Sequence, residues 1–247
     1  GTTGGSYVYH LPDNQISLRL IVDLSYKNPH LSPFDELQRW KHHPLIADLL
    51  EGGERISYGA RAISKGGLQA LPKLTVPGAL LAGDDAGFLN VLKIKGSHTA
   101  MKSGMLAAEA VFDELAQGHG YTEAATYQQR FEDSWLHEEL DRSRNVGPAL
   151  HKLGVLGGAA YAFVDQVFNG HQPWTLQDPI PDHATLKPAS ACKPIDYPKP
   201  DGVLSFDKLS SVFLSNTNHE EDQPCHLVLA DPAAPVRDNL PTYDEPS

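Results

Sequence analysis

The sequence has 247 residues, of which 40% are hydrophobic, enough for one large domain or two smaller ones with a sizeable core. Its formal net charge of -11 argues against nucleic-acid binding, because contact with a phosphate backbone needs clustered Lys and Arg. Two cysteines, Cys192 and Cys225, are too few for a disulfide framework or a four-cysteine metal site. No segment has the pattern of a signal peptide or the apolar length of a spanning helix, and we expect the sequence to begin within a longer protein.

The first 85 residues predict a hairpin, two short helices and then short strands. Apolar and polar positions alternate on both sides of "LPDNQ", whose Pro, Asp and Asn are turn residues. Ser32 before Pro33 is a plausible N-cap, and Pro44 interrupts the helical spacing that follows. The expected elements are strands at 6–9 and 16–24, helices at 33–40 and 44–51, a strand in "RISYGARAI" and a short buried strand in "PGALLAGDD".

Two longer amphipathic helices are expected next. The apolar residues that would line one side of the first, in order, are Met101, Met105, Ala108, Phe112 and Leu115. The second runs through "TEAATYQQRFEDSWLHEELDRSRNV" and offers Tyr127, Phe131, Trp135 and Leu140 for packing. From about residue 172 proline becomes frequent and helical periodicity stops, which places a module boundary near 172–195.

The segment from Gly83 to Ala110 has the pattern of a ligand site. A strand, a Gly-Asp pair, a loop and a helix with a small, polar first turn expose backbone N–H groups to an electron-rich ligand. Asp84 can accept hydrogen bonds from sugar hydroxyls, and glycines at 87, 96 and 104 allow close approach of a flat ligand. A structural helix cap is the alternative reading of the same residues.

Three motifs in the same order resemble electron-transfer flavoprotein:ubiquinone oxidoreductase. They are "KIKGSHTAMKSGMLAAEA", "YPKPDGVLSFD" and "NHEEDQP", and the likeness continues over nearly the whole chain. The resemblance implies a mixed α+β fold, with part of a glutathione-reductase-like FAD-binding domain, a quinone-binding subdomain and the start of a ferredoxin-like module. It implies an electron-transferring-flavoprotein dehydrogenase that uses FAD and one [4Fe-4S] cluster, and that passes electrons from the soluble flavoprotein to ubiquinone at a membrane.

The resemblance also implies a division of the chain and a set of cofactor contacts. Residues 1–75 would form the quinone-binding part, 76–171 the second half of the FAD domain with a membrane-contacting helix, and 172–247 a linker and truncated ferredoxin-like module. Thr99 or Ser97 would tune the flavin through its pyrimidine edge. The implied FAD contacts are Gly83, Asp84, Gly87, Phe88, Asn90, Gly96, Ser97, His98, Thr99, Ala100 and Met101.

An uncharged run from Leu153 to Val164 is too short to span a bilayer but long enough to lie in its interface. The residues alone favour a buried core helix, whereas the resemblance implies membrane contact. The implied membrane residues are Leu153, Val155, Leu156, Tyr161, Phe163, Val164 and Trp174. The expected location is peripheral, on the mitochondrial inner membrane or the bacterial cytoplasmic membrane.

The sequence departs from the family pattern in two places. It has no Gly-x-Gly-x-x-Gly fingerprint after a strand, and neither cysteine matches a cluster ligand, so both are read as structural. A fragment that is inactive alone is therefore expected. The alternatives are a geranylgeranyl-reductase-type flavoenzyme and a non-catalytic remnant.

Other polar residues carry weaker hypotheses. His42 and His43 are adjacent on a helix and point in different directions, which disfavours a shared metal ion. The "NHEEDQP" turn at 218–224 is read as solvated rather than metal-binding, and Arg55, Arg61 and Lys65 as solvated or near the cofactor. Lys93 and Lys95 lie just before the helix and could offset negative charge on a reduced flavin.

Overall fold

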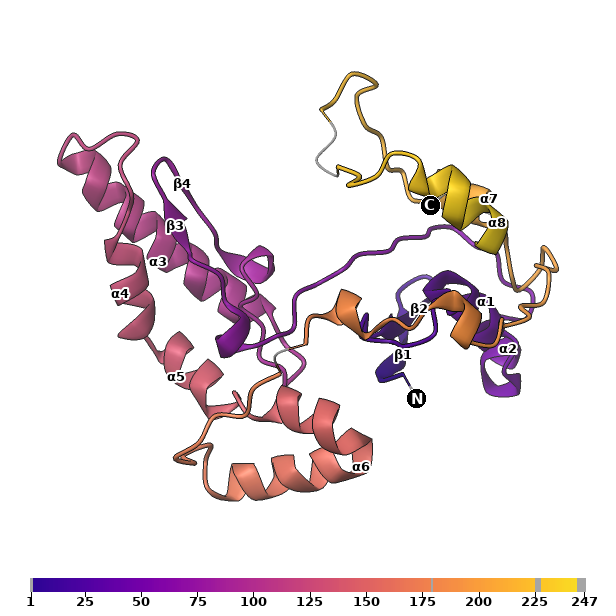
Figure 1. Cartoon of the computed structure of the whole chain (residues 1–247), viewed down its shortest axis with the longest axis horizontal. Helices are drawn as coiled ribbons and strands as arrows, with labels where there is room; N and C mark the ends of the chain where they lie inside the picture. The colour runs from indigo at the N-terminus through magenta and orange to yellow at the C-terminus, as the bar shows by residue number, and fades with distance from the viewer. Residues whose placement is uncertain (1, 179, 225–227, 244–247) are drawn as a thin grey trace. The chain divides into compact units, whose positions relative to one another are not determined.

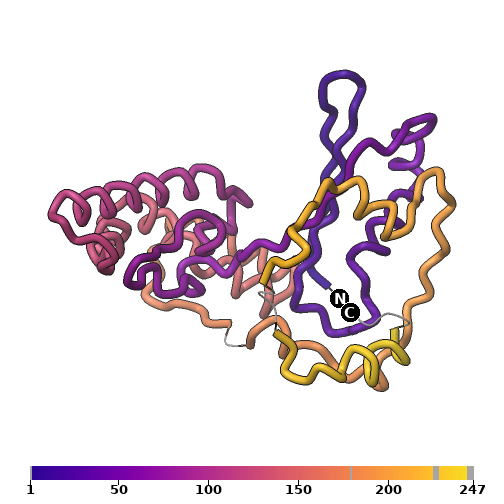
Figure 2. The backbone as a smooth tube through the Cα atoms, turned by 90° about the horizontal axis from the view of Figure 1, so that it is seen from above, coloured from indigo at the N-terminus to yellow at the C-terminus, as the bar shows by residue number. Residues whose placement is uncertain are grey.

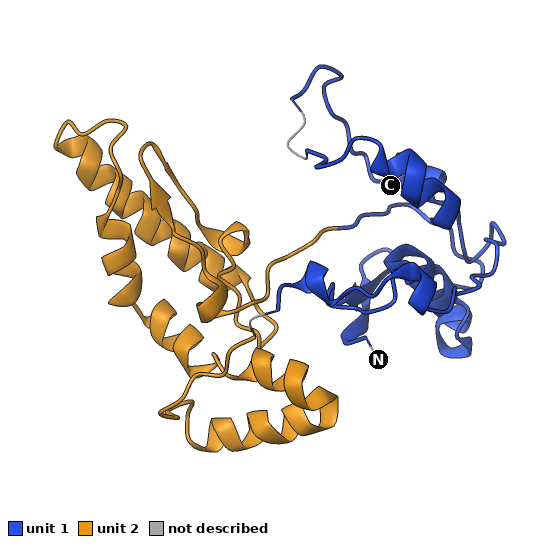
Figure 3. Cartoon of the chain, in the orientation of Figure 1, with its two compact units in different colours: residues 1–60, 180–247 blue, residues 61–179 orange. Residues whose placement is uncertain are grey.

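The computed structural model describes residues 2–178, 180–224 and 228–243 and divides the chain into two compact units. Unit 1 comprises 1–60 and 180–247, and unit 2 comprises 61–179 (Figure 3). The described residues form helices and two small two-stranded sheets, which gives the mixed helix and strand content that the sequence predicts (Figure 1).

Unit 1 begins with an antiparallel hairpin of β1 (Gly4–Leu11) and β2 (Gln15–Val22). The turn at residues 12–14 places Asp13 at φ 58° and Asn14 at φ 55°, a left-handed geometry that these two residue types tolerate. Figure 2 shows the two strands running side by side to the closed end. The predicted hairpin is confirmed, with its first strand beginning two residues earlier than expected.

Two short helices follow, as predicted. In α1 (Pro33–Lys41) the hydroxyl of Ser32 accepts a hydrogen bond from the Asp35 amide at 3.2 Å, which satisfies one free donor of the first turn. Pro33 occupies the first turn, where its missing N–H costs nothing. The second helix, α2, spans Pro44–Leu50.

The C-terminal segment of unit 1 packs back on α1. It contains 3-10 turns at Asp182–Thr185 and Ala189–Ala191, the helix α7 (Lys208–Phe213), a π-helical turn (Pro235–Asn239) and α8 (Leu240–Tyr243). The Phe206 amide donates to Gln38 Oε1 at 3.0 Å, and the Tyr197 hydroxyl donates to Glu36 Oε1 at 2.9 Å. These bonds join segments more than 160 residues apart in sequence.

A cationic cluster around Phe206 forms the buried side of this contact. The Arg55 guanidinium lies 3.9 Å from the ring centroid and donates to Ser211 Oγ at 2.7 Å, while Lys41 Nζ lies 5.0 Å from the same ring. Lys41 is only 9% exposed. Burial and, next, the charge of Arg55 lower the pKa of Lys41 to about 8, although Asp201 acts in the opposite direction.

We expect unit 1 to become more stable as the pH rises from 7.5 to 9.5. Between a folded pKa of about 8 and the ordinary 10.5, the unfolded chain holds a proton on Lys41 that the folded chain has lost. Raising the pH over this window should therefore stabilise the fold by about 1–2 kcal/mol. Urea unfolding followed by Trp40 fluorescence, with Trp135 and Trp174 changed to Phe, measures this slope.

The matched variants are Lys41→Met, which should remove the slope, and Lys27→Met at an exposed position, which should retain it. A slope that survives in Lys41→Met would assign the pH dependence to another group.

Unit 2 is built on α3 (Ser97–Ala116), which packs on α4 (Thr126–Glu132) and α5 (Trp135–Arg142). The single helix predicted over 122–145 is wrong, because Ser134 starts a new helix by accepting from the Leu136 amide at 3.2 Å. The core comprises Leu74, Ala86, Phe88, Leu106, Ala107, Ala110, Ala124, Tyr127, Phe131, Leu136 and Leu140. Of the four residues in this segment predicted to pack, Tyr127, Phe131 and Leu140 are buried and Trp135 is largely exposed.

The predicted packing face of α3 is also wrong. Met101, Met105, Phe112 and Leu115 are each 57–70% exposed, and the buried face instead contains Thr99, Ser103, Leu106, Ala107 and Ala110. Small side chains on the buried face allow the backbone of α3 to approach α4 and α5 closely. The large apolar side chains therefore form a separate exposed stripe.

Two predicted strands are not formed as expected. Residues 54–63 form neither helix nor strand, although the Tyr58 amide donates to the Leu214 carbonyl at 3.4 Å. In "PGALLAGDD" only Ala79–Leu80 (β4) pairs, with Thr75–Val76 (β3), and it is not buried. Gly78, at φ 79°, turns the chain after two residues and keeps this hairpin short.

The last element of unit 2 is α6 (Val146–Val167), which contains the predicted apolar helix. Gly154 has φ 70° and ψ -179°, so α6 consists of two helical arms that meet at a kink (Figure 1). A Cβ at Gly158 would lie 2.6 Å from Leu150 Cα, which shows that the arms fold against each other. None of the helices in the described ranges is long and apolar enough to cross a bilayer.

Candidate functional site

The N-terminus of α3 is free of side-chain caps. Gly96 is the N-cap residue and no side chain bonds to the first-turn amides, while Ser97 is exposed and His98 partly exposed. The first amides of a helix have no partner within the helix and carry its positive dipole end. This end of α3 can therefore donate hydrogen bonds to an electron-rich ligand, as the sequence pattern suggests.

The Gly-Asp turn lies beside the same helix. Residues Gly83–Asp85 form a single 3-10 turn in which the Gly83 amide donates to Ser103 Oγ at 2.9 Å. Gly83 has φ 70°, and its position lies against Ala100, since an added Cβ would be 3.6 Å from the Ala100 Cβ. Asp84 is exposed. The turn is thus anchored to α3 while its carboxylate is free to accept hydrogen bonds.

Two of the expected contact residues have structural partners instead. Phe88 is fully buried with its ring edge on Phe131, at 5.1 Å between centroids. The buried Thr99 hydroxyl is within hydrogen-bond reach of the Phe88 carbonyl and of the Gly96 carbonyl, the latter at 2.8 Å. Ser97, rather than Thr99, therefore has the exposed hydroxyl at the helix start.

A tight turn joins Asn90 to the helix. Asn90 and Lys95 form an antiparallel bridge, with the Asn90 amide 3.0 Å from the Lys95 carbonyl. Within the turn Ile94 adopts φ 52°, a left-handed conformation that a β-branched residue rarely takes. Ile94 is 72% exposed, so burial does not explain why this strain is retained.

Glu139 of α5 holds this turn and the helix start together. Its Oε1 atom accepts from Asn90 Nδ2 at 2.9 Å and lies 2.6 Å from His98 Nε2, and its Oε2 atom lies 2.8 Å from Lys93 Nζ. Burial raises the pKa of Glu139, but hydrogen bonds from Lys93, His98 and Asn90 outweigh it and bring the pKa to about 2. Sequence reasoning missed Glu139, because a charged residue on an amphipathic helix has the pattern of a solvated position.

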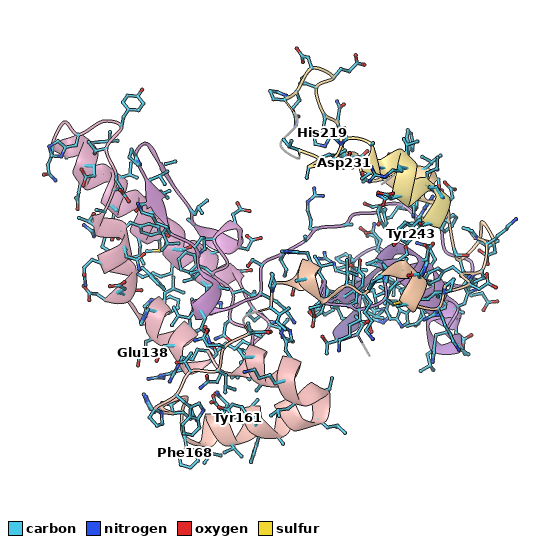
Figure 4. All side chains as sticks on the ribbon, viewed as in Figure 1. Glu138, Tyr161, Phe168, His219, Asp231 and Tyr243 are labelled. Carbon is cyan, nitrogen blue, oxygen red and sulfur yellow. The ribbon has the colours of Figure 1, made fainter. Side chains whose placement is uncertain are left out.

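Exposed apolar side chains lie on the second arm of α6, at the end of its first arm and in the loop after the helix. Figure 4 labels Tyr161 and Phe168 on the second arm, and the Tyr161 hydroxyl accepts from Trp174 Nε1 at 2.9 Å. The residues at least half exposed are Leu153, Val155, Leu156, Phe163, Val164, Val167, Phe168 and Trp174. Tyr161 is partly exposed, so the predicted membrane residues share this part of unit 2.

Arg144 fastens the loop that carries Trp174. Its guanidinium donates to the carbonyls of Asp141 and Gly170 at 2.9 Å each and to the Gln172 carbonyl at 2.6 Å. Its Nε donates to Thr175 Oγ1 at 3.0 Å, and its side chain is 11% exposed. The loop backbone is close-packed here, because a Cβ at Gly170 would lie 2.2 Å from the Arg142 carbonyl oxygen.

Metal-ligating residues do not gather within the described ranges. No group of three or more His, Cys, Asp or Glu side chains there could hold an ion. Cys192 is partly exposed with its Sγ 3.8 Å from the Lys27 carbonyl, Cys225 lies outside the described residues, and His42 Nε2 lies 3.0 Å from Ser205 Oγ. The two cysteines of the sequence cannot supply the four thiolates of a [4Fe-4S] cluster.

Two family models match the chain. Residues 1–63 match the ubiquinone-binding model of electron transfer flavoprotein-ubiquinone oxidoreductase, and residues 202–247 match its 4Fe-4S model. The protein of that name from Pseudomonas aeruginosa is 63% identical over 99% of this chain and 45% of its own length. The chain belongs to this family.

Other members of the family are similar over the same region. The Acinetobacter baylyi protein, named as a probable member, is 57% identical over 100% of this chain and 46% of its own length. The mitochondrial protein of Bos taurus is 52% identical over 99% of this chain and 41% of its own length. The chain thus spans a little under half the length of the curated relatives it matches, and the resemblance found from sequence motifs is confirmed.

Proposed function

We propose that the protein containing this chain passes electrons from reduced electron transfer flavoprotein to ubiquinone, as the names of its relatives state for them. The observation that carries the proposal is the uncapped, partly exposed start of α3 beside Asp84, in a chain that matches these relatives along almost its full length. The match to the 4Fe-4S family model favours this function over a geranylgeranyl-reductase type of flavoenzyme.

The residues at the start of α3 fit an FAD isoalloxazine and its polar chain. When bound, FAD would supply the electron-accepting ring. Asp84 would accept hydrogen bonds from hydroxyl groups of the cofactor, and the amides of Ser97 and His98 would donate to the electron-rich edge of the ring. Lys95, which is exposed, lies in the turn before these amides and adds positive charge.

In this proposal the other predicted contacts act through the backbone that they position. Phe88, Asn90 and Thr99 are buried and hold the segment between Gly83 and α3 against the core, and Gly87 is buried in the same segment. Gly83 begins the 3-10 turn at one end of this segment, and Gly96 is the N-cap of α3 at the other end. Ala100 and Met101 lie in the first turns of α3.

The proposed location is the surface of the mitochondrial inner membrane or bacterial cytoplasmic membrane. The apolar residues of α6 would rest in the lipid interface, where Trp174 and Tyr161 suit the headgroup level. Because the net charge is -11, apolar burial rather than attraction to anionic lipid would dominate this binding.

We assign a separate role to each of the three parts of the chain that the sequence predicts. Residues 1–75 serve the quinone, 76–171 the flavin and the membrane, and 172–247 the connection to an iron-sulfur module. The match of residues 1–63 to the ubiquinone-binding family model and of residues 202–247 to the 4Fe-4S family model supports the first and last of these assignments. No step is assigned to the cluster, since this chain does not contain its four ligands.

The test uses the natural protein that contains this chain. Its visible spectrum, iron content and rate of ubiquinone reduction by reduced electron transfer flavoprotein are measured together. Flavin absorbance, about four irons per protein and ubiquinone reduction support the proposal. Flavin without iron would favour the reductase alternative, and a protein with neither group would overturn the proposal in favour of a non-catalytic remnant.

A further inference from the structure

We propose that Glu139 is a positioning residue for the flavin, which fixes the shape of the turn before α3 and sets the net charge beside the ring. The proposal deepens the function proposed above and rests on the flavin lying at the start of α3. Glu139 does not touch the ring in this account. It acts through Asn90, Lys93 and His98, the three residues that it holds.

The geometry of the carboxylate supports this role. Both oxygens are engaged, since Oε1 contacts Asn90 Nδ2 and His98 Nε2 and Oε2 contacts Lys93 Nζ, all within 2.9 Å. Its side chain is 19% exposed. A partly buried carboxylate with three donors is held far more firmly than an exposed ion pair, because charge-assisted bonds strengthen as solvent is excluded.

The three partners come from different parts of the segment that would meet the flavin. Asn90 begins the tight turn, Lys93 lies within it, and His98 belongs to the first turn of α3. The Asn90 side chain also accepts from the Lys93 amide at 3.0 Å. One carboxylate on α5 therefore fixes the position of the turn relative to the helix amides.

The strained residue in this turn gives an independent reason to infer a functional constraint. Ile94 has φ 52° although it is β-branched, and such strain persists only where the surroundings determine the backbone. The bridge between Asn90 and Lys95 closes the turn around Ile94, and Glu139 holds the bridge residue Asn90. Residues kept in this conformation concentrate at ligand sites.

Glu139 also sets the net charge beside the start of α3. Lys93 is paired with Glu139, so the negative charge of the carboxylate offsets the positive charge of Lys93 near the start of α3. His98 lies against the same carboxylate, and its ring is parallel to that of Trp135 within 4°, at 6.1 Å between centroids. Removing the negative charge of Glu139 should therefore favour the reduced, more negative form of a ring bound at the helix end.

The experiment compares Glu139→Gln with Glu139→Asp in the natural flavin-containing protein. Glu139→Gln should raise the flavin midpoint potential in a spectroelectrochemical titration. It should also weaken FAD binding to the apoprotein at least about tenfold, since a charged acceptor with three donors is lost. Glu139→Asp retains the charge and should return the potential most of the way to the wild-type value.

Glu138→Gln is the matched control. Glu138 is the preceding residue of α5, its side chain is 60% exposed, and it pairs with Arg142 (Figure 4). The Glu138→Gln substitution removes the same charge from the solvent-exposed side of the same helix. It should leave the FAD affinity and the flavin midpoint potential unchanged. An equal shift in both variants would indicate a general charge effect and would overturn the positioning role.

The outcomes separate this inference from the proposed function. A wild-type protein without flavin would overturn the proposed function and this inference together. If the wild-type protein contains flavin and Glu139→Gln has the same FAD affinity and the same flavin midpoint potential, the positioning role of Glu139 alone is overturned. If Glu139→Gln does not fold, Lys93→Gln replaces a half-exposed partner and should lower the potential; an unchanged potential in this variant would reject the charge argument.

Discussion

Changing both Leu156 and Phe163 to glutamate is expected to abolish binding of the protein to neutral liposomes. Leu156 is 88% exposed and Phe163 is 74% exposed, so both can enter a lipid interface without unfolding the helix. Burial of each side chain contributes about 2 kcal/mol, and placing glutamate there adds a further cost. The double variant should therefore lose at least about a thousandfold in affinity.

Flotation with phosphatidylcholine vesicles checks this prediction. The matched control changes Leu209 and Phe213, which are 84% and 82% exposed on α7, to glutamate. The control should float like the wild type, and thermal unfolding should show that both double variants are folded. If the α6 variant floats undiminished, the membrane surface lies elsewhere.

Replacing Arg144 by methionine is expected to destabilise unit 2 by about 3 kcal/mol or more. Methionine retains much of the apolar stem but none of the donors, and the carbonyls of Asp141, Gly170 and Gln172 lose the bonds that the guanidinium makes. Loss of a nearly buried charge with several acceptors left unpaired has a cost of this size. Lysine would restore only part of the stability, since one ammonium cannot reproduce the planar fork.

Urea unfolding followed by Trp174 fluorescence, with Trp40 and Trp135 changed to Phe, measures the loss. Arg142→Met is the control, since the Arg142 side chain is 42% exposed and pairs with Glu138, which should make its removal worth less than about 1 kcal/mol. Equal midpoints for Arg144→Met and Arg142→Met would show that the Arg144 bonds do not stabilise the loop.

Local patterns in the sequence predict the elements that local interactions determine. The hairpin follows from Asp13 and Asn14, whose left-handed backbone needs no distant partner. The start of α1 follows in the same way from Ser32 and Pro33, which act within one helical turn. The beginning of α3 at Ser97 also agrees with the small, polar residues of its first turn.

Tertiary packing decides what the sequence could not predict. On α3 two faces are apolar by periodicity, and side-chain size favours the stripe at Met101, Met105, Phe112 and Leu115 as the packing face. The structure instead buries small residues such as Ala107 and Ala110, because helices can then approach each other closely. Side-chain size alone does not show which neighbours a helix will have.

Polar residues of the candidate site were missed for a related reason. Glu139 and Arg144 each organise backbone and side chains that lie 26 to 49 residues away in sequence. Neither is part of a motif, and each has an unremarkable place in a charged helical segment. Their importance comes from partial burial and from the number of partners, which only the folded chain determines.

The exposed stripe of α3 has a practical consequence. Both methionines of the sequence, Met101 and Met105, lie on it, and they are 66% and 57% exposed. Thioether sulfur is oxidised by peroxide at a rate that follows its solvent access. Mass-spectrometric footprinting of these two sulfur atoms therefore reports, without any mutation, whether another polypeptide shields this side of the helix in the native assembly.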